Sequence, residues 1–379
     1  MSSVLLLAVN RHQERYFSAI AAADSQLNIK VLHDNRLPLF FWPKRLDRNQ
    51  QALVNRIAAL RLKTVEQEAP GYLLGGIKKI LLATRYRWAA YWFLQRALHF
   101  FGRHQFALVG LWSGRKWRQQ IVCEVIKNQT VKTAFFENGA FPGTTTLDPA
   151  GVNFASSIPR VPEFYRRLGH VDASLLPKRL TVRKARNGQE QAEQVVLPER
   201  YIFVPFQVDS DTQVVEYSPW IKNMEHLYQV IAAIKSRAGE ELPRVLIKEH
   251  PSSKNDYRHL HQRNPDISFC NGVNTQELIE KAELIVTINS SVGFESLLLN
   301  KPVITLGEAF YNIDGLVQHA NDESALLQKC LAPFAPDERL RDAFLVYLYE
   351  DYYVKGAWRD ADAQHLQTVV KKIETMLSC

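Results

Sequence analysis

A buried strand that runs directly into a helix is encoded by the stretch Leu284-Ile285-Val286-Thr287-Ile288-Asn289-Ser290-Ser291-Val292-Gly293-Phe294-Glu295. The apolar run ends in a small polar turn, and the turn leads into a helical segment. A strand joined to a helix in this way is the repeating unit of a parallel α/β sheet. Ser290, Ser291 and Gly293 then lie at a helix N-terminus, where hydroxyls and N–H groups can bind a phosphate. Glu295 lies one turn further along the helix, where its side chain either reaches ribose hydroxyls, faces solvent or packs against neighbouring residues.

The same alternation of short apolar strands and longer helical segments occurs in both halves of the chain. The expected strands cover residues 3–9, 29–33, 106–112 and 132–137, and then 201–206, 244–248, 267–270, 284–288 and 303–306. Two such series predict an α/β protein with two Rossmann-like domains facing each other across a cleft, the GT-B-like arrangement. The expected parts are an N-terminal acceptor domain (1–180), a C-terminal donor domain (198–340) and helices that cross back and brace the domains (341–379). A polar, charge-dense linker is expected near 177–197.

The composition limits the class of protein. The chain has 379 residues, a formal charge of +8 and four scattered cysteines without a C-x-x-C pair. This spacing argues against a disulfide framework and a zinc site. Neither a G-x-G-x-x-G after the first strand nor a P-loop motif occurs, which disfavours NAD-dependent and P-loop enzymes. The opening apolar run is too short for a signal sequence or a membrane span, so a cytoplasmic protein is expected.

Three segments carry charges and amides directly after expected strands. The first strand ends at Glu137 and continues into Asn138, Gly139 and a glycine- and proline-rich stretch that reaches Arg160. Such residues are typical of a site on a loop rather than of a core.

The second segment runs from Pro205 to Gln213 and contains Gln207, Asp209 and Asp211. Asp211 is either a cleft-facing carboxylate or the N-cap of the following helix. The D-x-D spacing of the two acids is only a weak metal signal.

The third segment is Lys248-Glu249-His250-Pro251, which follows another strand and pairs with the Ser-Ser-x-Gly helix start. His250 can donate a hydrogen bond to a phosphate oxygen. A lone His-Pro is usually only a loop feature, so the prediction of a phosphate site depends on its occurrence together with the Ser-Ser-x-Gly helix start.

Together these segments resemble the signatures of the capsule-type β-Kdo transferases, bacterial retaining enzymes of capsule polysaccharide biosynthesis that use CMP-Kdo as donor. The resemblance extends over about residues 110–306, with the three segments in the same order. It implies that Asp211 is the nucleophile, with Asp209 the weaker match, and that Glu137 is the acid/base group. It also implies that His250, with Gln207, Lys248, Ser290, Ser291, Gly293 and Glu295, serves the donor, and that Asn138, Gly139 and Arg160 position substrate.

No metal or other cofactor is expected, because of the chemistry of the donor. CMP leaves with a single phosphate, whose charge a histidine and a helix N-terminus can stabilise. Net retention by two displacements needs one nucleophilic carboxylate and one acid/base group, as in retaining glycosidases. Arg160 could hold the Kdo carboxylate in a bidentate pair.

A basic and aromatic region lies between Lys78 and Arg118. Its aromatic residues form either a core face or a surface that contacts an anionic membrane or a glycolipid acceptor. No nucleic-acid-binding motif accompanies it. The expected partners are CMP-Kdo, a glycan or glycolipid acceptor and an anionic membrane surface at the inner face of the inner membrane, with no nucleic acid.

Two other classes of function stay open at the level of sequence. One is a GT-B enzyme with a different nucleotide sugar, such as a sialyltransferase or a UDP-sugar epimerase. The other is a non-catalytic peripheral component of capsule assembly or export. Release of CMP from a defined donor separates these classes. The acceptor, the linkage position and the oligomeric state are not encoded in any motif.

Overall fold

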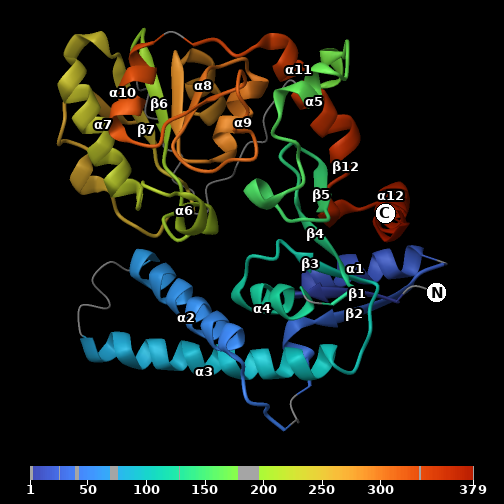
Figure 1. Ribbon diagram of the computed structural model, residues 1–379. Helices are drawn as coiled ribbons and strands as arrows, with labels where there is room; N and C mark the ends of the chain where they lie inside the picture. The colour runs from blue at the N-terminus through green and yellow to red at the C-terminus, as the bar shows by residue number, and fades with distance from the viewer. Residues whose placement is uncertain are drawn as a thin grey trace. The chain divides into compact units, whose positions relative to one another are not determined.

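The computed structural model describes residues 3–24, 26–38, 42–68, 76–127, 129–177, 196–332 and 334–378 (Figure 1). The chain forms two compact units. Unit 1 comprises Met1–Lys63, Gly71–Ile158 and Asp351–Cys379, and unit 2 comprises Thr64–Pro70 and Pro159–Glu350. Each unit has its own six-stranded sheet. The expected α/β class with two mainly parallel sheets is confirmed.

The boundaries of the units differ from the expected ranges. The chain passes from unit 1 to unit 2 after Ile158 rather than near residue 180, and it returns to unit 1 at Asp351. The expected C-terminal segment 341–379 is therefore divided between the units, and its bracing role stays a prediction. Of the expected linker 177–197, residues 178–195 lie outside the described residues.

Unit 1 is a sheet with the strand order β12-β5-β4-β3-β1-β2. Strands β1 to β4 are parallel, and β4 then turns back into the antiparallel β5, which pairs with β12. The strands are β1 (Ser3–Ala8), β2 (Asn28–His33), β3 (Leu108–Trp112), β4 (Lys132–Asn138), β5 (Thr144–Asp148) and β12 (Val354–Lys355). The helices are α1 (Arg11–Ala23), α2 (Arg48–Glu68, its last five residues grouped with unit 2), α3 (Gly76–Phe101), α4 (Trp117–Ile126) and α12 (Ala363–Ser378).

Both faces of this sheet are covered, as an uninterrupted apolar strand requires. Alternate residues of β1 point to opposite faces, so Leu5 and Leu7 pack with residues of α3 and α4. Val4 and Leu6 pack on the other face with residues of α1 and α12. The two expected strands Ser3–Val9 and Phe106–Trp112 are thus confirmed, each slightly shorter than expected.

Unit 2 is a fully parallel sheet with the order β8-β7-β6-β9-β10-β11. Its strands are β6 (Tyr201–Pro205), β7 (Arg244–Lys248), β8 (Ile267–Phe269), β9 (Leu284–Thr287), β10 (Val303–Thr305) and β11 (Gln318–His319). Its helices are α5 (Pro162–Arg166), α6 (Thr212–Tyr217), α7 (Met224–Ala238), α8 (Thr275–Lys281), α9 (Ser291–Leu298), α10 (Glu323–Leu331) and α11 (Glu338–Tyr347), and a π-helical turn, Leu348–Tyr352, follows α11.

The strand order of unit 2 fixes where a ligand would bind. The strands of unit 2 lie in the order of the Rossmann fold. From β6 the chain first adds strands on one side of the sheet, and from β9 it adds them on the other side. In open α/β sheets, ligands bind at the carboxyl ends of the strands at this switch point. The second of the three segments begins there, at the end of β6, and so does the Ser-Ser-x-Gly helix start after β9 that pairs with the third.

Candidate active site

A pair of amide side chains joins the two strands at the switch point. The Nε2 atom of Gln207 donates to Oδ1 of Asn289 at 3.0 Å, and the backbone N–H of Asn289 donates to Oε1 of Gln207 at 3.2 Å. The Nδ2 atom of Asn289 donates to the backbone carbonyls of Gln213 and Tyr217. The pair therefore fixes α6 and the β9–α9 turn together. A donor-binding role for the buried Gln207 stays a prediction, and Asn289, which no motif indicated, holds the Gln207 side chain in place.

Asp209 is only 5% exposed and is held on all sides. One carboxylate oxygen accepts from the Met224 N–H at 2.7 Å. The other accepts from the Tyr257 hydroxyl at 2.7 Å and from Asn255 Nδ2 at 2.6 Å. Burial, reinforced by the Asp209 carboxylate, raises the pKa of Tyr257 above its usual value. Asp209 thus ties the turn after β6 to the start of α7 and to the loop that follows β7.

Asp211 has the opposite environment, because its side chain is exposed. It is the N-cap of α6, and its Oδ1 accepts from the Gln213 N–H at 2.9 Å. The N-cap alternative considered from the sequence is therefore confirmed. Its second oxygen, Oδ2, makes no hydrogen bond within the part of the chain that the structure describes. A cap that uses one oxygen leaves the other for chemistry, so Asp211 rather than Asp209 has the environment of a nucleophile.

The start of α9 has the expected strand–turn–helix geometry. Ser290 caps the helix by accepting from the Val292 N–H at 3.2 Å, and Ser291 Oγ donates to a Glu295 carboxylate oxygen at 3.3 Å. The Tyr311 hydroxyl donates to the Ser290 carbonyl at 2.5 Å. A Cβ atom at Gly293 would overlap this hydroxyl, so only glycine allows Tyr311 to pack against the helix start.

Strand β7 adds a third set of side chains to the same edge of the sheet. It runs parallel to β6, and the last residue of β6, Pro205, pairs with the last residue of β7, Lys248. Lys248 Nζ donates to the carbonyl of Val273. His250 is half-buried, and its Nδ1 accepts from the Ser252 N–H at 3.1 Å. The neutral ring therefore carries its proton on Nε2, the tautomer that can donate to an anion.

In unit 1, the carboxylate of Glu137, the residue before the last of β4, is oriented by the neighbouring Asn138. Asn138 Nδ2 and the Asn138 N–H both donate to Oε1 of Glu137, at 3.1 and 3.0 Å. The indole N–H of Trp358 donates to Oδ1 of Asn138 at 2.7 Å, which fixes the direction of that amide. Trp358 is buried against Trp112 and Tyr16. It is a positioning residue whose link to Asn138 no sequence pattern indicated.

The other two expected positioning residues have different settings. Gly139 allows β4 to turn into β5, because a Cβ atom there would overlap the Thr144 side chain. Arg160 is half-buried and belongs to unit 2, next to Pro159, whose carbonyl accepts from the Tyr165 hydroxyl at 2.6 Å. The structure therefore groups Gln207, Asp211, Lys248, His250 and the α9 start in unit 2, and Glu137 with Asn138 and Gly139 in unit 1.

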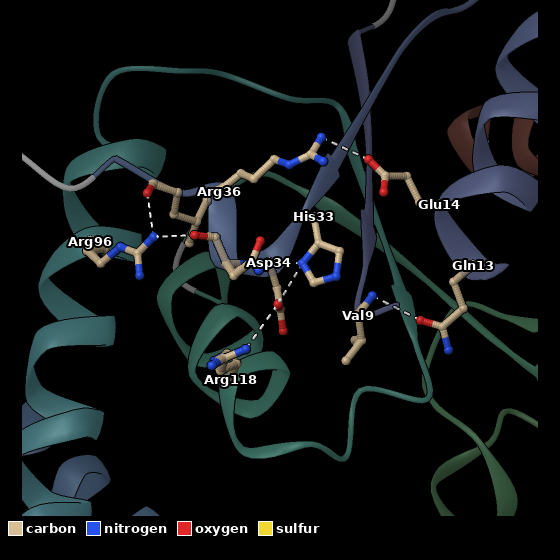
Figure 2. Close-up of polar contacts among 10 residues, drawn as sticks. Val9, Gln13, Glu14, His33, Asp34, Arg36, Arg96 and Arg118 are labelled. Atoms are coloured by element: carbon tan, nitrogen blue, oxygen red, sulfur yellow. Dashed lines mark hydrogen bonds and ion pairs between the residues drawn. The ribbon is translucent and has the colours of Figure 1, made fainter. Parts of the chain in front are cut away.

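The basic residues of the Lys78–Arg118 region divide into two kinds. Figure 2 shows Arg96 and Arg118 in polar contacts with other residues of unit 1. The Arg96 guanidinium donates to the backbone carbonyls of Asn35, Leu37 and Pro38, and Arg118 pairs with the buried Asp34 at 3.2 Å. These two arginines stabilise the fold, whereas Arg85 and Arg87 are exposed on α3.

Part of the chain matches the model of a known protein family. Residues 176–358 match the family described as capsule polysaccharide biosynthesis protein. The capsule resemblance read from the three motifs is thereby confirmed. The matched range includes β6, the α9 start and the aspartates after β6, and it does not include Glu137.

Two curated proteins are similar in sequence. Protein FixF of Sinorhizobium fredii is 39% identical over 254 residues, which are 67% of this chain and 61% of FixF. The capsule polysaccharide export protein KpsS of Escherichia coli is 27% identical over 282 residues, 59% of this chain and 71% of KpsS. The chain thus spans about three fifths of the length of FixF.

A solved structure is similar over nearly the whole chain. It is the Thermosulfurimonas dismutans KpsC β-Kdo 2,7 transferase, with a TM-score of 0.50 and 13% identity, covering 98% of this chain and 99% of that one. At this identity the likeness concerns the fold, and it agrees with the GT-B-like class expected from the strand series.

None of the helices described here is long and apolar enough to cross a bilayer. Among the same residues, no group of three or more His, Cys, Asp or Glu side chains has the arrangement to hold a metal ion. The metal-free mechanism itself stays an expectation.

Proposed function

We propose that this protein is a retaining β-Kdo transferase that moves Kdo from CMP-Kdo to a glycan or glycolipid acceptor during capsule or related surface polysaccharide synthesis in the cytoplasm. The observation that carries the proposal is the contrast between Asp209 and Asp211 at the switch point of unit 2. One carboxylate is buried and fully bonded, while the other is exposed with one oxygen unbonded among the described residues. The capsule family match and the KpsC-like fold support this reading.

The proposed reaction has two displacements. In the first, Asp211 Oδ2 attacks the anomeric carbon of Kdo, the bond to the CMP phosphate breaks, and a Kdo–aspartyl ester forms. In the second, the acceptor hydroxyl attacks the same carbon, Glu137 takes its proton, and the ester bond breaks to restore Asp211. Each displacement inverts the carbon, so the product keeps the donor configuration. Two carboxylates are required, and the chain offers one at the end of a strand in each unit.

The departing CMP needs stabilisation of its phosphate charge. The proposal assigns this to His250, through the proton on Nε2, and to the N-terminus of α9 with Ser290 and Ser291. Arg160 is assigned to the Kdo carboxylate.

Release of CMP tests the proposal directly. The protein is incubated with CMP-Kdo and a panel of glycan and glycolipid acceptors, and CMP and glycosylated product are both quantified. The expected result is acceptor-dependent CMP release with formation of a β-linked Kdo product. Turnover with CMP-sialic acid or a UDP-sugar instead of CMP-Kdo would assign the alternative donor. Absence of CMP binding and of turnover with every donor would favour the non-catalytic alternative.

Replacement of His250 by Ala should lower turnover by about 10²-fold, the scale of one lost electrostatic donor. The unfolding midpoint should stay close to that of the wild type, because the side chain is half-buried in a surface turn. His259→Ala is the matched control, since His259 is an exposed histidine of the same unit. If both variants turn over at the wild-type rate, His250 has no part in CMP departure.

A further inference from the structure

The first half of α3, up to Trp88, carries an exposed apolar stripe. Ile77 is 76% exposed, Ile80 66%, Leu81 65% and Trp88 66%. With 3.6 residues per turn, these positions and Thr84 fall within an arc of about 100° on one side of the helix. Four of the ten large apolar residues that are exposed in the described chain therefore lie together on this one helix face.

Thr84 does not interrupt the stripe. Its hydroxyl donates to the carbonyl of Ile80, one turn earlier, at 2.9 Å. Because the polar group is bonded inside the helix, the residue adds little polar surface to the stripe. The face can consequently enter an apolar environment without an unbonded hydroxyl.

Cations flank the stripe on both sides. Lys78 and Arg85 lie on one flank and Arg87 on the other, as the same helical spacing requires. No Asp or Glu occurs anywhere in α3. On the opposite side of α3, Arg61 of α2 stacks on the ring of Tyr86 with 3.9 Å between the guanidinium carbon and the ring centroid, so that side of the helix faces α2 and the stripe faces away from it.

The second half of α3 is built differently. Phe93, Leu94, Ala97 and Phe100 are buried in the core of unit 1, and Arg96 is bonded to backbone carbonyls. Figure 1 shows this half against the sheet of unit 1 and the first half extending past it. The core alternative for the region is thus confirmed for the second half of the helix, and the membrane alternative stays open for the first half.

We propose that the first half of α3 binds an anionic membrane surface, with the stripe formed by Ile77, Ile80, Leu81, Thr84 and Trp88 inserted at the boundary of headgroups and acyl chains. The flanking lysine and arginines then contact lipid phosphates while their stems lie along the apolar layer. Trp88 has the amphipathic ring that is enriched at this depth.

The charges favour a lipid over a second copy of this chain. In a two-fold symmetric pair built on the stripe, the flanking cations of one copy would approach those of the other, and α3 offers no acid to compensate them. Lipid phosphates instead neutralise these cations. The proposal concerns attachment and does not depend on the transferase reaction.

Vesicle binding tests the proposal in two arms with matched controls. Binding of the full chain is measured by flotation, with vesicles of phosphatidylcholine alone and of phosphatidylcholine mixed with phosphatidylglycerol, at low and high salt. The apolar arm is Ile80→Ser with Leu81→Ser, and its control is Leu168→Ser with Leu175→Ser, two exposed leucines of unit 2. The charge arm is Arg85→Gln with Arg87→Gln, and its control is Arg339→Gln with Lys371→Gln, exposed cations on α11 and α12.

The wild type should bind the mixed vesicles, with an affinity that falls as salt rises. The apolar pair should weaken this binding about ten-fold or more. The charge pair should weaken it about five-fold per cation and flatten the salt dependence. Circular dichroism and CMP binding should be unchanged in all variants.

Equal loss in the control variants, or equal binding to vesicles without phosphatidylglycerol, would overturn the proposal. A lipid-independent dimer that the Ile80→Ser and Leu81→Ser pair disrupts would assign the stripe to a second copy instead. Vesicle binding without turnover of CMP-Kdo would contradict only the transferase function.

Discussion

Asp211→Asn should lower transfer by about 10⁴-fold or more while leaving the protein folded. The amide is isosteric with the carboxylate and is also a good N-cap, so the bond to the Gln213 N–H survives and the free energy of unfolding should change by only a few tenths of a kcal/mol. An amide cannot attack the anomeric carbon as a carboxylate does. Turnover is measured as CMP release with acceptor present, and stability by urea unfolding.

Asp209→Asn is the matched variant, two residues away, and should show the reverse behaviour. The carboxylate accepts from three donors, and an amide would direct its own N–H₂ group at one or two of them. The loss should be about 1–3 kcal/mol of unfolding free energy, the scale of a buried polar group left unsatisfied. If instead Asp209→Asn is stable and inactive and Asp211→Asn turns over normally, the two assignments must be exchanged.

Glu137→Gln should stop the reaction halfway. The glutamine keeps an oxygen for the Asn138 amide, so local structure should be retained. Because the group is needed to take the proton of the acceptor, the first displacement should still release one equivalent of CMP. The Kdo–aspartyl ester should then accumulate and be detectable by mass spectrometry on the peptide that contains Asp211, while multiple turnover falls by about 10²- to 10⁴-fold.

Trp358→Phe is the control for the orientation of Glu137. Phenylalanine retains most of the packing with Trp112 but has no N–H for Asn138. A smaller loss of turnover than in Glu137→Gln, with no accumulation of ester at steady state, is expected. Steady multiple turnover in Glu137→Gln at the wild-type rate would remove this residue from the mechanism.

The sequence predicted the parallel strands well because their signal is local. Each of the nine expected strands is present within about two residues, since each is an apolar run bounded by turn residues. Strands β11 and β12, of two residues each, were missed, and so was β5. Its five residues, Thr144–Asp148, include three threonines and lie between a glycine and a proline, which reads as a loop. Its pairing depends on the turn at Gly139 and on β12, more than two hundred residues away.

The site was predictable only in part, because contacts between residues far apart in the chain determine it. That Asp209 is buried follows from Asn255 and Tyr257, which come from a loop after β7 and cannot be associated with it by spacing. Residue type and spacing therefore did not separate the two aspartates, and only the family resemblance favoured Asp211. Asn289 and Trp358 were similarly hidden, because each acts through a contact with a residue distant in the chain.

The return of residues 351–379 to unit 1 has a consequence for how the protein is made. Strand β12 and helix α12 complete unit 1, yet they are synthesised after all of unit 2. Because most of unit 2 is one continuous segment, 159–350, it can assemble while the ribosome is still extending the chain. Unit 1 must hold an unfinished sheet edge and an uncovered face throughout that interval. A fragment that stops at residue 158 would keep those surfaces permanently exposed, so it should be the half more prone to aggregation.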